Sequence, residues 1–257
     1  MKFNSLKRAM YLFILIVLPL LSFGNDQAAA LFAKGNASYA KGHYKEALEA
    51  YQKILKENSP SAELWFNMGN ASYRMDDIPS ALLYYERAHK LSPDDEDIKV
   101  NIRLANLKTT DKIEEAPQFF INRWWLSFIL SFSSFVLSVW SIILVLLGSA
   151  ALILYFFAES PVIKRASFYT AVLLFFLGLT TVFVAGRQVS YFENHKQGIV
   201  FISPLAVKST PAEQPKSLFI LHEGTKVNIV ENSGEWIKIR LANGTEGWVR
   251  QADLKEI

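Results

Sequence analysis

The chain has 257 residues, of which 51% are hydrophobic and 20% are charged, and it contains no cysteine. This composition is too apolar for a disordered chain, and the missing cysteine excludes disulfides, thiolate metal sites and cysteine nucleophiles. The net charge of +3 comes from Lys2, Lys7 and Arg8, because removing these three leaves 24 basic against 24 acidic residues. The charge therefore belongs to the N-terminal segment and predicts no nucleic-acid binding.

Residues 1–24 are typical of a secretory signal peptide. A basic start is followed by an apolar run over residues 9–21, and then by the small residues Ser22 and Gly24 at positions −3 and −1 of a cleavage site. The alternative is an uncleaved anchor, although the run is shorter than the ~20 residues that a membrane span needs. Both interpretations send the chain out of the cytoplasm at residue 25, so they predict the same topology.

An internal repeat follows the signal segment. The pentapeptide Gly-Asn-Ala-Ser-Tyr occurs at residues 35–39 and again at 69–73, and the pairs Ala47/Ala81 and Tyr51/Tyr85 keep the same displacement of 34 residues. This period resembles the tetratricopeptide repeat, a helix-turn-helix unit, and predicts repeats at 28–61 and 62–95. The small residues should lie where the two helices of each repeat cross.

A further helix is predicted after the second repeat. Ser92 as N-cap, Pro93 at the first helical position and the following acids are favourable helix-start residues. Ile98, Ile102 and Ala105 would lie on one stripe, so this helix is expected to act as a solvating cap and to complete a helical domain over residues 25–110.

The resemblance to tetratricopeptide repeats implies a concave face built from the first helix of each repeat. The residues expected there are Phe32, Asn36, Tyr39, Phe66, Asn67, Asn70, Tyr73 and Arg74. One interpretation is a groove for an extended peptide of a protein partner, with asparagine amides bonding its backbone and aromatic rings packing its side chains. The other is that these are ordinary repeat positions without a ligand. Relatives that clamp a C-terminal carboxylate use lysine and arginine where this chain has Phe32, Asp97 and Asn101, so that clamp is not expected.

A long uncharged stretch predicts a membrane hairpin. Between Arg123 and Glu159 there is no charge, and as one helix this stretch would be about 52 Å long, well beyond a ~30 Å hydrocarbon core. We therefore assign 111–133 to a linker and an interfacial helix with Trp124 and Trp125, 134–157 to one transmembrane helix, and 166–186 to a second.

The connection over residues 158–165 carries Lys164 and Arg165, which fit the cytoplasmic side, so both large flanks should be periplasmic. The protein is thus expected in the inner membrane, with the lipid bilayer as a partner. Small residues at helical spacing in the two uncharged runs should let the helices face each other. They are Ser127, Ser131, Ser134, Ser138, Ser141 and Gly148 in the first run, and Ala171, Gly178 and Ala185 in the second.

The C-terminal part, residues 198–257, follows a short linker at 187–197 and reads as a small β domain. Five strands are predicted, at 199–203, 217–221, 226–231, 236–241 and 247–250, with Asn243-Gly244 as a hairpin turn. Phrases such as Gly247-Trp248-Val249 resemble the bacterial SH3 module, which implies a small all-β barrel. Some relatives contact cell-wall peptides through this module, and here both that role and simple docking stay open.

No residue pattern predicts catalysis. The four histidines, His43, His89, His195 and His222, form no HExxH pair, and the chain has no GxSxG, P-loop or GxGxxG motif. We therefore expect no enzymatic activity, no cofactor and no metal.

The order of modules along the whole chain is a signal peptide, a tetratricopeptide stack, a two-helix transmembrane hairpin and a bacterial SH3 barrel. That multi-domain order resembles the BatE-type proteins of the Bacteroides aerotolerance (Bat) operon. The resemblance implies a periplasm-facing assembly linked to stress or oxygen tolerance, with von Willebrand A domain membrane proteins and a MoxR-type ATPase as partners. Two hypotheses follow: a membrane-anchored scaffold that binds proteins, or a sensor of cell-wall peptides acting through the SH3 module.

Overall fold

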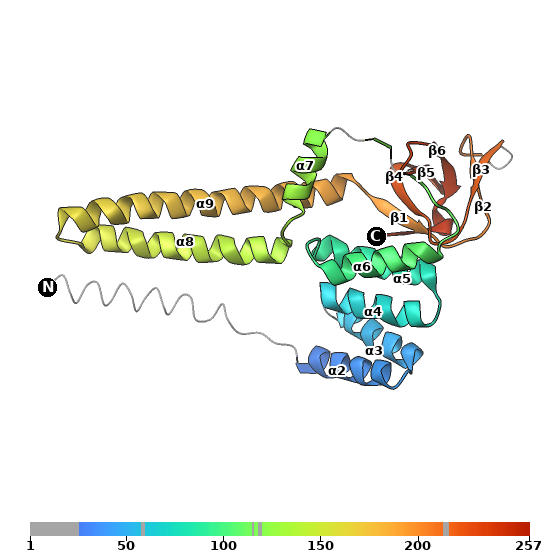
Figure 1. Cartoon of the computed structure of the whole chain (residues 1–257), viewed down its shortest axis with the longest axis horizontal. Helices are drawn as coiled ribbons and strands as arrows, with labels where there is room; N and C mark the ends of the chain where they lie inside the picture. Colours follow the sequence, from blue (N-terminus) through green and yellow to red (C-terminus); the bar gives the residue numbers. More distant parts are fainter. Residues whose placement is uncertain (1–25, 58–59, 115, 118–119, 213–215) are drawn as a thin grey trace. The chain divides into compact units, whose positions relative to one another are not determined.

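The computed structural model describes residues 26–57, 60–114, 116–117, 120–212 and 216–257 (Figure 1). The predicted signal peptide, 1–24, lies outside the described residues. The chain forms two compact units. We call Ser134–Gln188 the hairpin unit, and Gln27–Ser133 together with Val189–Ile257 the repeat–sheet unit; each is described by itself.

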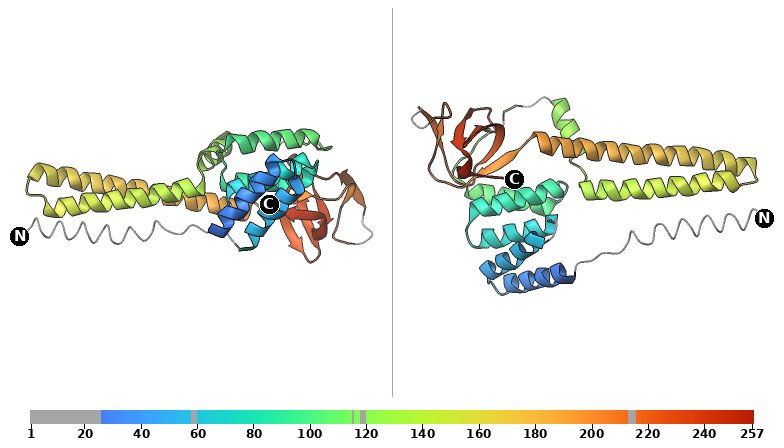
Figure 2. Two further views of the ribbon diagram at one scale, coloured as in Figure 1. Left: turned by 90° about the horizontal axis from the view of Figure 1, so that it is seen from below. Right: turned by 180° about the vertical axis from the view of Figure 1, so that it is seen from behind.

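Five helices stack in chain order at the start of the repeat–sheet unit (Figures 1 and 2). They are α2 (Asp26–Ala40), α3 (Tyr44–Glu57), α4 (Ala62–Arg74), α5 (Ile78–Leu91) and α6 (Glu96–Lys108). The carboxylate of Asp95 caps α6 by accepting from the backbone N–H groups of Asp97 and Ile98. The predicted cap, Ser92, instead ends α5, because its N–H donates to the carbonyl oxygen of Ala88. The acidic residues were expected after the N-cap of α6, but one of them, Asp95, is the N-cap itself.

The glycines of the repeated pentapeptide allow the paired helices to approach closely. A Cβ on Gly35 would lie 2.3 Å from the ring of Tyr51, and one on Gly69 would lie 2.5 Å from the ring of Tyr85. Ala47 and Ala81 are fully buried beside these contacts. The expectation that small residues mark the helix crossings is therefore confirmed.

The C-terminal residues form one antiparallel sheet in the order β3-β2-β6-β5-β4-β1-β7. The strands are β1 (Gln197–Val200), β2 (Leu205–Lys208), β3 (Ser217–Leu221), β4 (Lys226–Ser233), β5 (Trp236–Arg240), β6 (Glu246–Arg250) and β7 (Leu254–Glu256). The predicted number of five strands is wrong, because the prediction missed the short strands β2 and β7, of four and three residues. Val207, Val227, Ile239 and Val249 lie at the centre of the sheet's core.

The hairpin unit consists of α8 (Ser134–Phe157) and the part of α9 (Pro161–Asn194) up to Gln188. Helix α9 is longer than the predicted segment 166–186: it starts at Pro161, a residue suited to the first turn of a helix, and runs through most of the expected 187–197 linker. Both helices are long and apolar enough to cross a membrane. Within the apolar 18-residue stretch of each helix, only 11% of the residues of α8 and 17% of those of α9 are buried. A core helix of a soluble domain would be mostly covered.

Small residues of α9 lie against α8. Ala171 and Gly178 are buried, and a Cβ on Gly178 would lie 3.4–3.5 Å from Val145 and Leu144. On α8, Gly148 lies in the same way against the ring of Phe175. Ser138, in contrast, is exposed and its hydroxyl donates to the carbonyl oxygen of Ser134. The predicted facing of small residues thus holds for these glycines and not for Ser138.

The contact between Gly69 and Tyr85 gives the first prediction. We expect Gly69→Ala to destabilise the repeat–sheet unit by about 1–3 kcal/mol, because the added methyl group would overlap a buried ring. This loss should exceed the gain of about 1 kcal/mol in helix propensity. Thermal unfolding of the purified chain measures the effect.

The matched control is Gly186→Ala in α9, where an added Cβ meets nothing within 4 Å. A Gly69→Ala protein that unfolds at or above the wild-type temperature would contradict the packing described for the helix crossing.

Candidate functional site

The asparagines expected in the concave groove bond to neighbouring helices. The amide oxygen of Asn36 accepts hydrogen bonds from the hydroxyl of Tyr51 (2.7 Å) and from the amide nitrogen of Asn67 (3.4 Å). One repeat further on, Asn70 accepts in the same way from Tyr85 (2.9 Å) and Asn101 (3.2 Å). An amide oxygen has two acceptor positions. Those of Asn36 and Asn70 are therefore occupied by the stack itself.

The aromatic residues at these positions also pack internally. The ring of Phe32 lies 5.8 Å from that of Tyr51, and Phe66 lies 5.9 Å from Tyr85, with the same interplanar angle of 48°. Burial raises the pKa of Tyr51 to about 12, and it raises the pKa of Tyr85 as well. Both phenols therefore remain protonated donors to their asparagines at neutral pH. The structure brings Phe32, Asn36, Phe66, Asn67 and Asn70 together as a packing and hydrogen-bond ladder.

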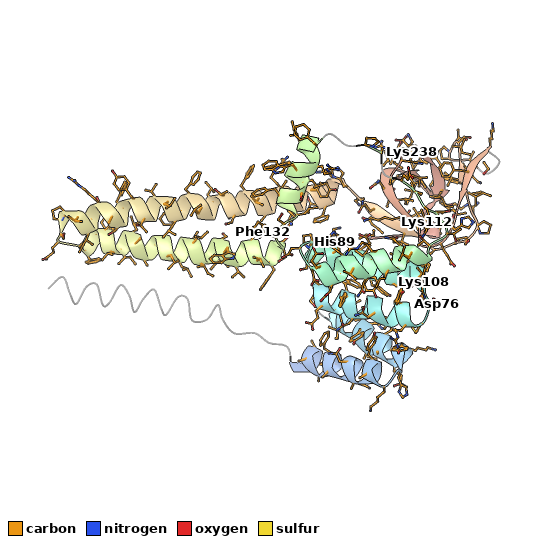
Figure 3. The ribbon with its side chains drawn as sticks, viewed as in Figure 1. Asp76, His89, Lys108, Lys112, Phe132 and Lys238 are labelled. Carbon is orange, nitrogen blue, oxygen red and sulfur yellow. The ribbon has the colours of Figure 1, made fainter. Side chains whose placement is uncertain are left out.

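The other three residues predicted for the groove, Tyr39, Tyr73 and Arg74, lie at the C-terminal ends of α2 and α4. Tyr39 packs edge-on against Tyr44 at 5.2 Å, and the guanidinium of Arg74 also lies 5.2 Å from the Tyr44 ring. The ring of Tyr73 is covered by the ammonium of Lys108 at 4.7 Å. Figure 3 shows Lys108 beside Asp76, with which it forms a 2.6 Å ion pair. Of the eight predicted residues, Arg74 presents an exposed charge that a partner could reach.

Sequence reasoning missed a contact between the helical stack and the sheet, which we call the junction. It joins α5 and residues 109–114 to the sheet (Figure 1). The carboxylate of Asp111 accepts from the backbone N–H of His222 (2.8 Å), from the ring Nδ1 of His222 (2.8 Å) and from the hydroxyl of Thr225 (2.6 Å). Burial alone would raise the pKa of Asp111, but these hydrogen bonds outweigh it and lower the pKa.

Charged residues of α5 complete the polar part of the junction. The carboxylate of Glu86, whose side chain is only 7% exposed, pairs with the ammonium of Lys226 at 2.7 Å. Arg87 donates to the backbone carbonyl oxygen of Glu256 at 2.6 Å, and Lys90 donates to that of Ile257 at 3.4 Å. This pair favours one orientation, because moving the partly exposed Lys226 away would leave the buried carboxylate of Glu86 without its counter-charge.

The apolar part of the junction is fully closed. Ile199 of β1 is 0% exposed and packs in the same cluster as Leu82 and Tyr85 of α5. The backbone of Gly224 lies close to the helical stack: a Cβ at this position would be 2.9 Å from the side chain of Thr109 and 3.5 Å from that of Leu82. The φ of +84° at Gly224 is also a conformation that favours glycine. The stack and the sheet therefore form one body.

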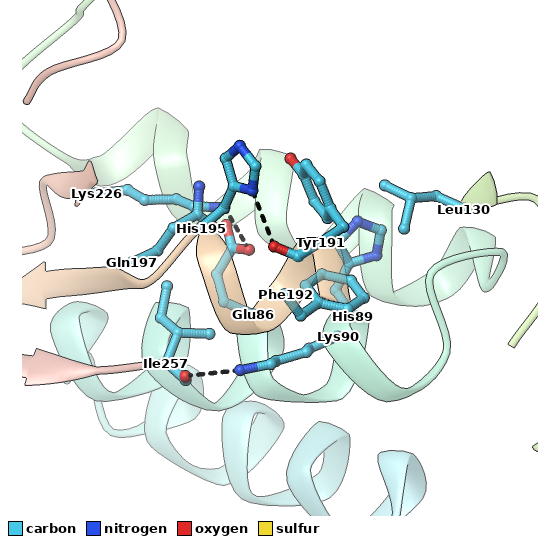
Figure 4. A pocket seen from close by; sticks show the side chains of 10 residues that line it. All are labelled: Glu86, His89, Lys90, Leu130, Tyr191, Phe192, His195, Gln197, Lys226 and Ile257. Carbon is cyan, nitrogen blue, oxygen red and sulfur yellow. Dashed lines mark hydrogen bonds and ion pairs between the residues drawn. The ribbon is translucent and has the colours of Figure 1, made fainter. Parts of the chain in front are cut away.

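A cavity of about 130 Å³ lies next to the junction (Figure 4). The residues that line it are Glu86, His89, Lys90, Leu130, Tyr191, Phe192, His195, Gln197, Lys226 and Ile257. The Nδ1 atom of His89 is buried and has no hydrogen-bond partner among the described residues, and burial lowers the pKa of this imidazole. Within the described part of the chain, no group of three histidine or acidic side chains could hold a metal ion.

Comparisons with known proteins agree with this architecture. Profiles of the tetratricopeptide repeat match residues 35–76 and 62–95, and a profile of the bacterial SH3 domain matches residues 203–255. The predicted fold class is confirmed: a multi-domain chain with a helical tetratricopeptide-like stack, two long apolar helices and a small antiparallel β domain of the SH3 kind. The repeats point to a non-catalytic protein-interaction scaffold.

No curated protein matches the chain. Among solved structures, PcrH from Pseudomonas aeruginosa is similar at 14% sequence identity and a TM-score of 0.33, with 62% of this chain and 97% of that chain covered. A similarity of this size carries no argument about function.

The hydrogen bonds to Asp111 generate the second prediction. Asp111→Asn places an amide nitrogen, itself a donor, among three donors, so we expect a loss of about 1–3 kcal/mol at the junction. Hydrogen–deuterium exchange should become faster at His222 and Thr225. The control is Glu114→Gln, a change at an exposed carboxylate of the same segment. Unchanged exchange in Asp111→Asn would contradict the role given to this residue.

The third prediction concerns pH. Because burial lowers the pKa of His89, the unfolded chain binds a proton more readily than the folded chain below about pH 6.5. The contribution of neutral His89 to the free energy of unfolding is complete above that pH. It is lost as the pH falls toward the pKa that His89 has in the folded chain. We expect the melting temperature to fall by about 2–4 °C for each kcal/mol lost between pH 7.5 and pH 5.5.

The variant His89→Gln should reduce this pH-dependent loss. Equal pH profiles for wild type and His89→Gln would show that another group is responsible.

Proposed function

We propose that the chain is a membrane-anchored scaffold without catalytic activity, which binds protein partners on the periplasmic side of a bacterial inner membrane. The junction is the observation that carries this proposal. It joins, in one compact unit, two interaction modules that lie on either side of α8 and α9 in the sequence. A unit that contains two recognition modules in contact is suited to hold partners near each other.

The junction also supports the proposed topology. Asp111 precedes the two apolar helices and His222 follows them, yet their side chains are hydrogen-bonded. If α8 crosses a membrane, α9 has to return, because otherwise these residues would lie on opposite sides. Together with the signal peptide predicted at residues 1–24, this argues for the repeats and the SH3 domain in the periplasm and the short connection with Lys164 in the cytoplasm.

Helix α7 (Phe120–Ile129) supports an arrangement at the membrane surface. It exposes Phe120, Trp124, Trp125 and Phe128, and only residues 130–133 separate it from α8. Amphipathic aromatic rings settle at the boundary between water and lipid. We therefore assign α7 to the outer interface, as the part of the linker 111–133 that fixes the height of the scaffold.

The order of modules resembles that of BatE-type proteins, so we place the scaffold in a Bat-type assembly for stress or oxygen tolerance. Its partners there would be von Willebrand A domain membrane proteins served by a MoxR-type ATPase. Since the amide oxygens of Asn36 and Asn70 accept hydrogen bonds within the stack, partner recognition in the groove should depend more on the exposed cation of Arg74 than on these two oxygens.

A second candidate function, binding of cell-wall peptides, is favoured by β3. This edge strand of the SH3 domain exposes Leu218 and Ile220, and an edge strand can pair with an extended peptide. Deleting residues 198–257 would not separate the two functions cleanly, because it would uncover Glu86 and the apolar surface that Ile199 covers. Point changes on the surface are the better test.

The fourth prediction separates the two functions. With p-benzoylphenylalanine at position 75, the exposed neighbour of Arg74 at the end of α4, ultraviolet crosslinking in intact cells should capture a membrane protein, whereas the same group at position 53, exposed on α3, should not. The adduct should persist when Leu218→Glu and Ile220→Glu are added. Loss of wall retention in that double variant, without any adduct at position 75, would favour the wall-binding function and contradict the scaffold.

A further inference from the structure

The cavity next to the junction contains polar atoms that lack partners within the described chain. All the residues that line it belong to the repeat–sheet unit (Figure 4). The buried Nδ1 atom of His89, on α5, has no hydrogen-bond partner there. The hydroxyl of Tyr191, near the end of α9, makes no hydrogen bond with another described residue either. Buried polar groups are normally satisfied by protein, water or a ligand, so these atoms indicate a polar occupant.

The lining side chains include two ammonium groups, those of Lys90 and Lys226, against one carboxylate, that of Glu86. Each ammonium carries three N–H donors and uses one of them. Lys90 donates to the carbonyl oxygen of Ile257 at 3.4 Å, and Lys226 donates to Glu86 at 2.7 Å. The remaining donors, together with the hydroxyl of Tyr191, fit a ligand that is anionic and rich in acceptor oxygens, as a phosphate group is.

The end of α9 lies at the level of lipid headgroups if this helix crosses a membrane as proposed. The uncharged run of the continuous helix ends at Gly186, and Tyr191 follows five residues later. At a rise of 1.5 Å per residue, Tyr191 lies at most about 7.5 Å beyond the hydrocarbon core. The headgroup layer on each side is about 5–8 Å thick, given a core of ~30 Å in a bilayer of ~40–45 Å. The cavity therefore lies at the depth of lipid phosphates.

We infer that the cavity binds the phosphate group of a membrane phospholipid. Lys90 and Tyr191 would donate to its oxygens, and the apolar side chains of Leu130 and Phe192 would contact the adjoining glycerol. A lipid is favoured over free phosphate, whose chemistry is the same, because the headgroup layer presents phosphate at this depth. The site rests on the membrane anchoring of the proposed function and goes beyond it, since Arg74 of the groove is not among the lining residues.

Chemical modification of histidines tests this inference on the unaltered chain. The full chain in dodecyl maltoside, a detergent without phosphate, is treated with diethyl pyrocarbonate, which reacts with accessible imidazoles. His195 is exposed at the cavity, and His43 is exposed before the start of α3. Dihexanoylphosphatidylglycerol should slow the modification of His195 and leave that of His43 unchanged. Dihexanoylglycerol, which lacks the phosphate group, should protect neither residue.

Variants then show which side chains hold the phosphate. Lys90→Gln combined with Tyr191→Phe removes an ammonium and a hydroxyl, but it keeps the ring at position 191 that stacks on His195 at 4.4 Å. We expect half-maximal protection at a roughly tenfold higher phospholipid concentration, which corresponds to about 1.4 kcal/mol. The control is Lys53→Gln, the same change of charge at an exposed position of α3, which should leave the concentration unchanged.

Three results would overturn the inference: no protection of His195 by the phospholipid, equal protection by dihexanoylglycerol, or an unchanged half-maximal concentration in the double variant. Protection by sodium phosphate at the same concentration would assign the cavity to free phosphate and overturn the lipid as its source. Crosslinking from position 75 reports on the scaffold function without involving the cavity, so a failure of one is distinguishable from a failure of the other.

Discussion

The contact on which the structure depends is the set of hydrogen bonds to the carboxylate of Asp111. This residue lies in the segment that follows α6, and its three donors come from His222 and Thr225, which follow the hairpin in the sequence. The contact closes a loop of the chain that contains two long apolar helices. If α8 crosses a membrane, as proposed, α9 has to cross it in the opposite direction, because a membrane cannot separate two groups that are 2.8 Å apart.

The junction contains an apolar contact and a charged pair, and the two have different roles. The closed apolar contact of Ile199 supplies the free energy of docking, since burial of aliphatic surface is the main favourable contribution. The pair of the buried Glu86 and the partly exposed Lys226 contributes less net stability, but it penalises rotation of the SH3 domain on α5, which would leave the carboxylate without its counter-charge. The two modules are therefore held in one relative orientation, as a scaffold needs.

Sequence analysis predicted the features that depend on a local residue pattern, and it missed the contacts between residues that are far apart in the chain. The repeat register identified Gly69 and Ala81 correctly, because each repeat presents the same pattern 34 residues apart. The groove residues were also placed on the first helices, but the hydrogen bonds of Asn70 to Tyr85 and Asn101 leave no local signal. The hydrogen bond between Asp111 and His222 joins residues that are 111 positions apart, and no sequence periodicity indicates such a pair.

Labelling of single cysteines in spheroplasts tests the central claim most directly. The sites are Gln52→Cys on α3, Ser233→Cys at the end of β4 and Lys164→Cys near the start of α9, all exposed. A membrane-impermeant maleimide should label positions 52 and 233 in intact spheroplasts, and position 164 only after permeabilisation. If only one of positions 52 and 233 is labelled in intact spheroplasts, the repeats and the SH3 domain lie on opposite sides of the membrane, and the junction cannot exist in the membrane-bound protein.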